Sequence, residues 1–374
     1  MKRDKSIVCH LSTVHVRTDV RVFYKECVTL AIAGYKTHLI VADGKGNDYN
    51  QAVIIHDLGR YSSRIKRILL APALLFLAAV KIPAYVYHFH DPELLPIGLL
   101  LKLFTKAKII YDAHESYPDD MLYKDYLPAW SRIIASRGIK ILEDFIACRM
   151  DAVITVTDYH AKRFLPINAN TFTICNYPLK KEWDFLHSTV VDKKPLSIGY
   201  VGNITRKRGI SQLLTAIESL DCTLHLAGSY EPLDYRQELC NMPAWHKVVE
   251  YGYVSRDIAI EIISSSLVGV MLFLPEPNHI NSLSTKVFEY MAGATCVLVS
   301  NFQVYEKTIQ DQNCGVCVDP FDTIQITETL RQLLDNPTKT VLMGKQGREL
   351  AYHKYNWESQ QKKLLEAYTK LIDN

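Results

Sequence analysis

The sequence lacks any strong imbalance of charge. Its 374 residues include 43 lysines and arginines and 40 aspartates and glutamates, which leaves a formal net charge of +3. Proteins that bind nucleic acid usually have a larger basic excess, gathered on one face. The composition therefore gives no support to nucleic-acid binding, and a hydrophobic content of 48% is typical of a globular protein.

The sequence lacks cysteine spacing of the kind that forms a disulfide framework. The nine cysteines are scattered and odd in number, which is typical of a reducing compartment. Cys314 and Cys317 are the only close pair, and no second Cys or His pair with zinc spacing accompanies them. Alternation around Val316 predicts a strand at this point, so we expect no metal or redox site there.

Long apolar runs are also missing. Met1–Lys5 leads into a short strand and not into the apolar segment of a signal peptide. The most apolar run, Ile68–Val80, is too short to span a bilayer and contains Pro72. We expect a buried helix here. Because basic residues flank the run, a helix that rests on an anionic membrane is the alternative. We expect a cytoplasmic protein, peripheral on the inner membrane face under that alternative.

Short apolar strands alternate with helical stretches in both halves of the chain. This alternation predicts βαβ units and parallel sheets with both faces covered. A chain of this length suits two domains, which we place at residues 1–190 and 195–354, joined by a polar, Lys-rich linker between Asn176 and Pro195. The predicted strands are Ile7–Leu11, Thr37–Ala42, Ala52–His56, Ala84–His90, Lys108–Tyr111 and Ala152–Thr157, then Leu196–Gly202, Thr223–Leu226, Val248–Tyr253, Val268–Phe273, Cys296–Val299 and Gly315–Val318. The predicted helices are Val20–Ala33, Ser63–Val80, Leu94–Phe104 and Trp130–Arg149, then Ile210–Leu220, Thr285–Met291, Ile324–Leu334, Lys339–Tyr352 and Trp357–Ile372.

Polar residues follow three of the predicted strands in the first half. Ser12–Arg21 follows the first strand, His88–Glu93 belongs to the end of the fourth, and Asp112–Tyr117 to the end of the fifth. In a parallel sheet of this kind, ligands bind beyond the carboxyl ends of the strands. We therefore expect these three segments to form one wall of a site.

Two segments of the second half have the chemistry of a phosphate site. In the first, strand Leu196–Gly202 leads through a basic loop to a helix, which places guanidinium groups above helix N–H groups. In the second, a polar loop leads into the helix near Thr285–Met291, with Lys286 in its first turn and Glu289 on the same face. A nucleotide sugar would place its diphosphate on the cation and its ribose on the carboxylate. A solvated basic turn and an ordinary core-packed helix are the alternatives.

The run Lys286-Val-Phe-Glu-Tyr-Met-Ala-Gly resembles the donor-site helix of family-four, GT-B-fold glycosyltransferases. Residues 202–209 resemble the family's Gly-Arg-x4-Lys-Gly signature, with Asn203 in place of its arginine and Arg208 in place of its lysine. The motifs follow in family order over nearly the full length. The resemblance implies an α/β protein of two Rossmann-like domains facing across a cleft. It also implies that the last helix, 356–374, packs back on the first domain.

The resemblance also implies roles for particular residues. The C-terminal domain would bind the nucleotide sugar, and the N-terminal domain the acceptor. The catalytic residues would be His114, Arg208 and Lys286, the two cations stabilising charge on the leaving phosphate. The donor-binding residues would be Gly202, Arg206, Arg208, Tyr253, Asn281, Ser282, Lys286 and Glu289. The acceptor side would include His15, Asp19 and Asp91. Tyr253 would stack on the base, although a core tyrosine is the alternative.

One departure from the family concerns catalysis. The family often has a Glu-x7-Glu pair, whose second member matches Glu289 and whose first position is Asn281 here. An amide can hydrogen-bond sugar hydroxyls but cannot act as a base. Glu276 is a weaker substitute nearby. The first loop of the chain also lacks the glycine-rich turn that many members have.

The expected function is a retaining glycosyltransferase that moves a sugar from a nucleotide-diphosphate sugar to a saccharide or lipid-linked acceptor. Its expected setting is the assembly of bacterial capsule, O-antigen, exopolysaccharide or glycolipid. No Asp-x-Asp motif is present, so we expect no metal and no other cofactor. Two alternatives remain open: a sugar-nucleotide 2-epimerase of the same fold, and a non-catalytic nucleotide-sugar-binding partner subunit, which Asn203 and Asn281 would favour.

Overall fold

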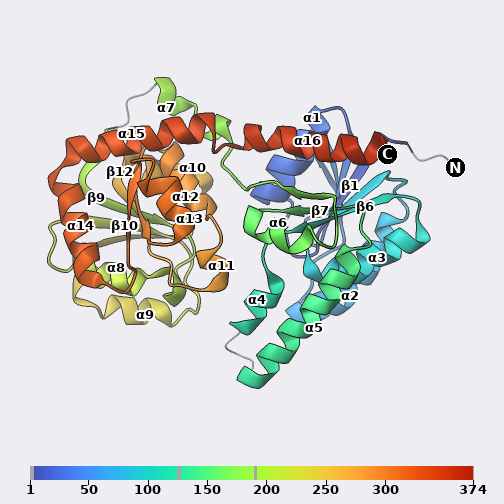
Figure 1. The fold of residues 1–374 in the computed structure, drawn as a ribbon, viewed down its shortest axis with the longest axis horizontal. Coiled ribbons are helices and arrows are strands. Elements are labelled where there is room, and N and C mark those ends of the chain that lie inside the picture. Colours follow the sequence, from blue (N-terminus) through green and yellow to red (C-terminus); the bar gives the residue numbers. More distant parts are fainter. Residues whose placement is uncertain (1–3, 124–127, 189–191, 374) are drawn as a thin grey trace. The chain divides into compact units, whose positions relative to one another are not determined.

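The computed structural model describes residues 4–123, 128–188 and 192–373, which divide into two compact units (Figure 1). The first unit runs to Asn176 and resumes at Trp357, so that the C-terminal helix belongs to it. The second unit comprises Tyr177–Asn356. Each unit is built on its own sheet, and the alternation of strands and helices predicted from the sequence is confirmed.

The first unit has an eight-stranded sheet in the order β3-β4-β2-β1-β5-β6-β7-β8. All neighbouring strands are parallel except the β3–β4 pair, which is antiparallel. The strands are β1 (Ile7–Leu11), β2 (Lys36–Val41), β3 (Asp48–Asn50), β4 (Val53–Asp57), β5 (Val86–Phe89), β6 (Lys108–Ala113), β7 (Ala152–Thr155) and β8 (Thr171–Thr173). The sequence analysis missed β3 and β8, because each has only three residues and neither is buried.

The helices of the first unit are η1 (Val20–Cys27), α1 (Val28–Ile32), α2 (Arg64–Ala79), η2 (Pro92–Leu94), α3 (Leu95–Phe104), α4 (Tyr117–Leu122), α5 (Ala129–Ala147), α6 (Asp158–Phe164) and α16 (Trp357–Asp373). The single helix expected at Val20–Ala33 begins as the π-helix η1. Its N-cap is Asp19, whose side chain accepts hydrogen bonds from the backbone N–H groups of Arg21 and Val22. Turns of π-helix occur frequently at functional sites.

The expectation of a buried helix at Ile68–Val80 is wrong. Only one stripe of α2 is buried, formed by Ala71, Leu75 and Ala79 at intervals of one turn. The large apolar side chains of α2 that are exposed are Ile65, Ile68, Leu69, Leu70, Leu74 and Leu77. The elements that α2 contacts, α3, β2 and η2, cover only this stripe, so the remaining apolar faces of α2 stay in solvent. No helix among the described residues is long and apolar enough to cross a bilayer.

The second unit has a six-stranded parallel sheet in the order β11-β10-β9-β12-β13-β14. Its strands are β9 (Lys194–Val201), β10 (Thr223–Ala227), β11 (Val248–Gly252), β12 (Ser266–Met271), β13 (Cys296–Ser300) and β14 (Gly315–Val318). Its helices are η3 (Lys180–Glu182), α7 (Phe185–Ser188), η4 (Arg206–Arg208), α8 (Ile210–Ile217), α9 (Tyr235–Cys240), η5 (Pro243–Lys247), α10 (Arg256–Ser265), α11 (Pro277–Ile280), α12 (Thr285–Ala292), α13 (Gln303–Tyr305), η6 (Glu306–Gln310), α14 (Thr323–Asp335) and α15 (Pro337–His353).

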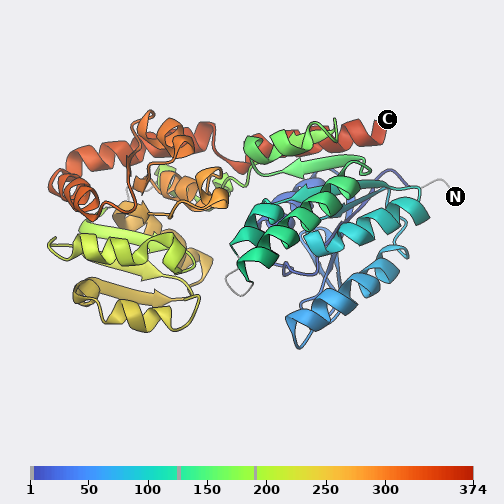
Figure 2. The same ribbon diagram turned by 60° about the horizontal axis from the view of Figure 1, so that its bottom comes forward.

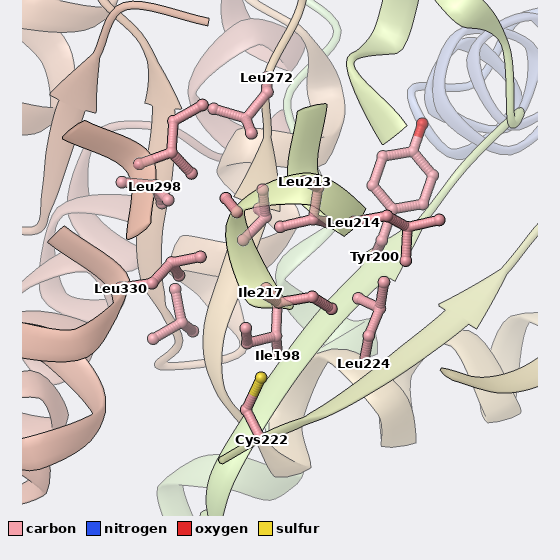
Figure 3. Close-up of a cluster of buried hydrophobic side chains, with 14 of the residues drawn as sticks. Ile198, Tyr200, Leu213, Leu214, Ile217, Cys222, Leu224, Leu272, Leu298 and Leu330 are labelled. Carbon is pink, nitrogen blue, oxygen red and sulfur yellow. The ribbon is translucent and has the colours of Figure 1, made fainter. Parts of the chain in front are cut away.

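The core on one side of this second sheet joins strand and helix side chains (Figure 3). Ile198 of β9 and Leu224 of β10 meet Leu213 and Ile217 of α8, all of them at most 1% exposed. Leu330 of α14 completes the cluster. This packing fixes α8, whose first turn lies at the carboxyl end of β9.

The first boundary between the units differs from the predicted one. The sequence analysis ended the first domain at residue 190, whereas the structure ends it at Asn176. The reason is that Trp183 and Leu186 are buried in the core of the second unit, where the ring of Trp183 packs against Gly293. The polar segment after Pro178 is therefore part of the second unit and not a free linker.

Candidate functional site

The polar loop before α12 leads to a capped helix N-terminus. The side chain of Ser284 accepts a hydrogen bond from the backbone N–H of Lys286, at 3.4 Å. The backbone N–H of Ser284 donates to the hydroxyl of Tyr305, at 3.3 Å. The hydroxyl of Ser282 donates to the carbonyl of Asn278 and thereby holds the loop to α11. The start of α12 is thus fixed from both sides.

Glu289 lies between two cations in this site. Its Oε2 is 2.8 Å from Lys286 Nζ, and its Oε1 is 2.8 Å from Arg256 Nη1. Arg256, on α10, also contacts Glu182 at 2.8 Å. Burial alone would lower the pKa of Arg256, but Glu289 and Glu182 hold it above its usual value. The predicted Lys286–Glu289 pairing is therefore present, and the sequence analysis missed its third member, Arg256, which no local pattern connects to α12.

The carboxyl ends of β9 and β10 approach each other at two glycines. Gly202 and Gly228 have φ angles of +154° and +152°. A Cβ atom on Gly228 would lie 1.7 Å from the carbonyl oxygen of Gly202, so no larger residue fits there. The result is a backbone turn without side chains at the carboxyl ends of these two inner strands.

Arg208 lies beside this turn, at the start of α8. Its Nη1 would be 3.2 Å from a Cβ on Gly202, and its guanidinium group lies over the ring of Phe273, 5.3 Å from the centroid. Burial raises the pKa of the neighbouring Tyr200 to about 12, and Arg208 opposes that rise. No ion pair found in the described ranges involves Arg208. Its positive charge therefore has no carboxylate partner in the site.

The other two basic residues of η4 do have such partners. The guanidinium group of Arg206 contacts Glu238, with 3.2 Å between Nε and Oε2, and lies over the ring of Tyr235. Lys207 Nζ is 2.8 Å from Oε1 of Glu276. The expectation that Arg206 supplies a second donor-binding charge stays a prediction, but the structure directs this side chain toward α9.

The loops after β9 and β12 form one continuous surface. The backbone N–H of Leu274 donates to the carbonyl of Lys207, at 2.9 Å. Gly209 has a φ angle of +71°, and a Cβ there would lie 2.0 Å from the carbonyl oxygen of Leu272. Glycine is thus required where these two loops touch. Arg208 is positioned by this contact.

The remaining predicted donor residues lie on loops of the same unit. Asn281 is the C-cap of α11, and its side-chain amide donates to the carbonyl of Pro277, at 3.2 Å. The side chain thus turns back onto its own helix. Tyr253 follows β11 and is 88% exposed, so the alternative that it is a core tyrosine is wrong.

In the first unit, the three polar segments predicted to form a wall do meet. They follow β1, β5 and β6, which are adjacent strands. Asp91 Oδ2 accepts hydrogen bonds from the backbone N–H of Thr13 at 2.6 Å and of Val14 at 3.1 Å. His15 lies between Asp19 at 3.0 Å and Asp91 at 3.6 Å. Burial alone would lower the pKa of His15, but Asp19 and Asp91 raise it above its usual value.

His114 is held by a buried ion pair that the sequence analysis did not identify. Asp112 accepts two hydrogen bonds from Arg21, at 3.0 and 3.1 Å, and one from His114 Nε2, at 2.9 Å. Burial alone would raise the pKa of Asp112, but Arg21 and His114 hold it well below its usual range. A charged carboxylate accepts and cannot donate, so neutral His114 has its proton on Nε2. Its Nδ1 is then a hydrogen-bond acceptor.

Behind His114 lies a cluster of fully buried polar side chains. Its members are His10 on β1, Glu26 on η1, His88 and His90 at the end of β5, and Tyr368 on α16. Burial lowers the pKa of His10 and His88 well below the usual value and that of His90 to about 4, so the rings are neutral. Two groups have ligand atoms within 4.8 Å of one another and could hold a metal ion: His10, Glu26, His88 and His90, and separately His90, Asp112 and His114.

The sequence analysis missed this cluster, although one signal was present. Positions 88 and 90 alternate along a strand, so two histidines there lie on the same face. Nothing local connects them to His10, which pairs with His88 only through the parallel β1–β5 register. Tyr368 joins the cluster from the opposite end of the chain.

Comparison with known proteins finds similarity to a family within the second unit. Residues 182–350 match the family model described as "Glycosyl transferases group 1". Two curated relatives match over similar lengths of chain. An MMP alpha-(1->4)-mannosyltransferase of Mycolicibacterium hassiacum is 26% identical over 175 residues, and an alpha-D-kanosaminyltransferase of Streptomyces kanamyceticus is 24% identical over 172. Each match covers 44% of this chain, and 40% and 43% respectively of the relatives, so the chain spans well under half of their length.

Solved structures resemble the whole chain. A sucrose-phosphate synthase of Thermosynechococcus elongatus superposes with a TM-score of 0.80 at 18% identity, covering 98% of this chain and 99% of that one. The Anabaena protein Alr3699/HepE, solved with UDP and glucose, gives a TM-score of 0.73 at 12% identity, covering 98% and 100%. At such low identities the likeness concerns the fold alone. The predicted two-domain α/β fold of the GT-B class is confirmed.

Proposed function

We propose that this chain, a GT-B-fold protein whose residues 182–350 belong to the glycosyl transferases group 1, transfers a sugar from a nucleotide-diphosphate sugar to an acceptor. The observation that supports this most directly is Arg208. It is a partly buried cation without a carboxylate partner among the described ion pairs, and it lies beside a glycine turn at the carboxyl end of β9. A phosphate group is the natural counter-ion for such a position.

The donor diphosphate would bind between Arg208 and the first turn of α12. The N-terminus of α12 carries the positive end of the helix dipole, and Lys286 adds a full charge there. When the glycosidic bond breaks, negative charge develops on the β-phosphate oxygen, and pre-placed cations stabilise it. In this proposal Arg208 and Lys286 supply that stabilisation and no divalent metal is needed for it. Glu289 then positions Lys286 and Arg256.

His114 would act on the side of the acceptor. Because Asp112 keeps the proton on Nε2, Nδ1 of His114 is available to accept a hydrogen bond from a sugar or acceptor hydroxyl. His15, Asp19 and Asp91 line the same wall of the first unit. The family resemblance further supports transfer with retention of the anomeric configuration, which belongs to the proposal.

The setting we propose is the assembly of a bacterial polysaccharide or glycolipid on a lipid-linked acceptor. Helices α2, α3 and α5 lie side by side in the first unit (Figures 1 and 2). Besides the exposed face of α2, they expose Leu103, Phe104, Trp130, Ile134 and Ile141, each by more than 60%. Arg64 and Lys66 lie in the first turn of α2. Apolar side chains beside basic ones are typical of a surface that contacts an anionic membrane.

The activity is tested by donor binding followed by transfer. UDP-, GDP-, ADP- and dTDP-sugars are added to the wild type and to Arg208→Ala, and the shift in melting temperature is measured. A ligand that binds only the folded protein raises the melting temperature by mass action. We expect one donor to stabilise the wild type and not Arg208→Ala. Arg236→Ala is the control, since Arg236 pairs with Glu250 on the surface and should leave the shift unchanged.

The remaining outcomes separate the alternatives. Transfer of the sugar to an acceptor, with the anomeric configuration read by NMR, would establish the reaction. Conversion of the donor when no acceptor is present would instead indicate an epimerase. Binding without any reaction would indicate a partner subunit, and no binding of any nucleotide sugar would contradict the proposal.

Membrane contact is tested by flotation with vesicles. We expect the wild type to float with anionic vesicles and less with zwitterionic ones, and a variant with Leu69, Leu74 and Leu77 changed to Gln to remain at the bottom. Leu233→Gln, an exposed apolar site in the second unit, is the control. If the wild type does not float with anionic vesicles, this part of the proposal is wrong.

A further inference from the structure

The buried cluster of the first unit has polar atoms without hydrogen-bond partners. Both carboxylate oxygens of Glu26 and the Nε2 atom of His88 make no hydrogen bond among the described residues, although both side chains are fully buried. Oε1 of Glu26 is only in ion-pair contact with Arg21 Nε, at 3.1 Å. Buried polar groups in folded proteins nearly always have a partner, and an exception points to a bound water or ion.

The atoms around Glu26 have the separations of a coordination shell. Glu26 Oε2 is 3.9 Å from His10 Nδ1, 3.9 Å from His90 Nε2 and 4.0 Å from His88 Nδ1. Each of these distances is too long for a hydrogen bond. Around a tetrahedral ion with bonds of about 2.0–2.1 Å, ligand atoms lie about 3.3–3.4 Å apart. His10 Nδ1 and His90 Nε2 are 2.9 Å apart, so the observed separations lie on both sides of that value.

We propose that His10, Glu26, His88 and His90 bind one divalent transition-metal ion, with Zn²⁺ as the ion that this ligand set fits. Three imidazole nitrogens and one carboxylate oxygen suit zinc in tetrahedral geometry. All four positions come from the protein, which is the pattern of a structural site and not of a catalytic one. The site lies in the first unit, apart from the donor-binding residues of the second.

Two of the three opposite ring nitrogens, those of His90 and His10, have the partners that such ligands need. His90 Nδ1 donates to Asp112 Oδ2, at 3.2 Å, which leaves Nε2 as a lone pair. His10 Nε2 lies 3.1 Å from the hydroxyl of Tyr368, which can accept a hydrogen bond from Nε2–H when Nδ1 binds the ion. Histidine ligands are commonly oriented in this way by a carboxylate or another oxygen. In the structure, His88 Nδ1 lies 2.9 Å from the hydroxyl of Tyr368. When the ion binds, Nδ1 would contact the ion in place of that hydroxyl, and His88 would keep its proton on Nε2.

The proposed ion would connect three elements of the first unit. Glu26 comes from η1, His10 from β1, and His88 and His90 from the end of β5. A metal among them would anchor the π-helix to the sheet. It would also fix His90, whose other nitrogen binds the same Asp112 oxygen that orients His114. The ion binds Glu26 as a carboxylate, so a proton carried by that carboxyl leaves to solvent when the metal binds.

The test begins with the wild type, produced without a histidine tag. We expect elemental mass spectrometry to find about one zinc per chain. Because the cluster is fully buried, the protein is also unfolded with a chelator and refolded with Co²⁺. Bound Co²⁺ should show the visible bands of a tetrahedral site without the thiolate charge-transfer band that cysteine ligands would cause. Zn²⁺ in the refolding buffer should raise the melting temperature.

Substitutions of single residues test which side chains bind the ion. Glu26→Gln and His88→Gln should each lose the metal. His56→Gln is the matched control. His38 and His56 form a stacked pair in the same sheet, with 2.9 Å between Nδ1 of His38 and Nε2 of His56, and neither is in an ion pair among the described residues. If Glu26→Gln fails to fold, the wild-type spectra and His88→Gln still decide.

Two results would overturn the proposal. In one, the refolded wild type binds neither Zn²⁺ nor Co²⁺, and the cluster is a metal-free hydrogen-bonded network. In the other, His56→Gln loses the ion as fully as Glu26→Gln and His88→Gln, and the metal lies elsewhere. Either result is independent of whether the chain transfers sugars.

Discussion

The second unit builds its candidate site from loop backbone and partly exposed cations, whereas the first unit builds its site from side chains that the sheet buries. In the second unit, the backbone conformations of Gly202 and Gly209 set the shape of the loops, and the guanidinium group of Arg208 lies beside Gly202. In the first unit, Asp112 and the histidines behind it have no contact with solvent. Both sites lie at the carboxyl ends of parallel strands. The fold therefore sets the location of each site, but not the kinds of residue that form it.

The difference agrees with the ligands that we propose for the two sites. A charged, soluble ligand such as a diphosphate needs open N–H groups and cations that are free to receive it. A histidine that must keep one tautomer needs a fixed partner, and burial strengthens that partner because charges interact more strongly at low dielectric. Arg21 pairs with Asp112 inside the protein, whereas Arg208 has no carboxylate partner among the described ion pairs, and we propose a phosphate group as its counter-ion.

The largest effect is expected at Arg208. Replacing it with alanine should lower kcat/KM by about 10²–10³-fold, since it removes one preorganised charge from the leaving phosphate. The measurement is steady-state transfer from the donor found by thermal shift. Arg206→Ala is the matched comparison from the same turn, and its pairing with Glu238 predicts a loss of less than about tenfold. Equal losses at the two positions would contradict the distinction between them.

The next largest effect is expected from a change in the loop backbone at Gly209. Gly209→Ala should lower the free energy of unfolding by about 2–4 kcal/mol, because its Cβ would meet the carbonyl of Leu272 at 2.0 Å and its φ is positive. Denaturant unfolding measures the change. Gly138→Ala is the control. Gly138 lies in α5, and no atom lies within 4 Å of a new Cβ, so alanine should raise the free energy of unfolding by about 0.5–1 kcal/mol. A neutral Gly209→Ala would show that the two loops are not in contact as described.

Buried histidine should make the first unit sensitive to acid. Burial lowers the pKa of His160, on α6, from its usual 6.5 to about 4. The unfolded chain therefore takes up a proton near pH 6.5, and the folded protein only near pH 4. The free energy of unfolding is therefore highest above pH 6.5. It decreases as the pH drops toward 4, by at most about 3 kcal/mol for this group.

The measurement is unfolding by denaturant at several pH values between 7 and 4. His160→Gln should reduce the slope of stability against pH by about one proton. Trp357 reports on the first unit, and Trp245 on the second. An unchanged slope in His160→Gln would show that this histidine is not protected from acid.

The smallest effect is expected at Tyr253. Because its ring is 88% exposed, Tyr253→Ala should change stability by less than about 0.5 kcal/mol. If the ring stacks on the base of the donor, its loss should raise the donor KM about fivefold, for a stacking energy of about 1 kcal/mol. Leu233→Ala, 84% exposed in the same unit, is the control and should alter neither quantity. An unchanged KM in Tyr253→Ala would remove this residue from the donor site.

Much of the fold could be predicted because it depends on local pattern. Parallel strands such as β1 and β14 consist largely of apolar residues, and their predicted bounds agree with the structure. The three-residue strands β3 and β8 could not be predicted, since a short exposed strand has no apolar pattern. A buried α2 was expected and a surface helix was only the alternative, because apolar content does not tell which neighbours a helix has.

The sequence by itself determined the α/β class, the parallel sheets, and the glycine turn and basic residues that form the proposed phosphate site of the second unit. Those features depend on backbone conformation and on residues close together in the chain. Only the tertiary structure decided that Arg256 shares Glu289 with Lys286, that Arg206 turns toward Glu238, and that His10 meets His90 and Tyr368. These contacts join residues 33, 32, 80 and 358 positions apart. They exist because strand order and register bring distant side chains together, which a local pattern does not specify.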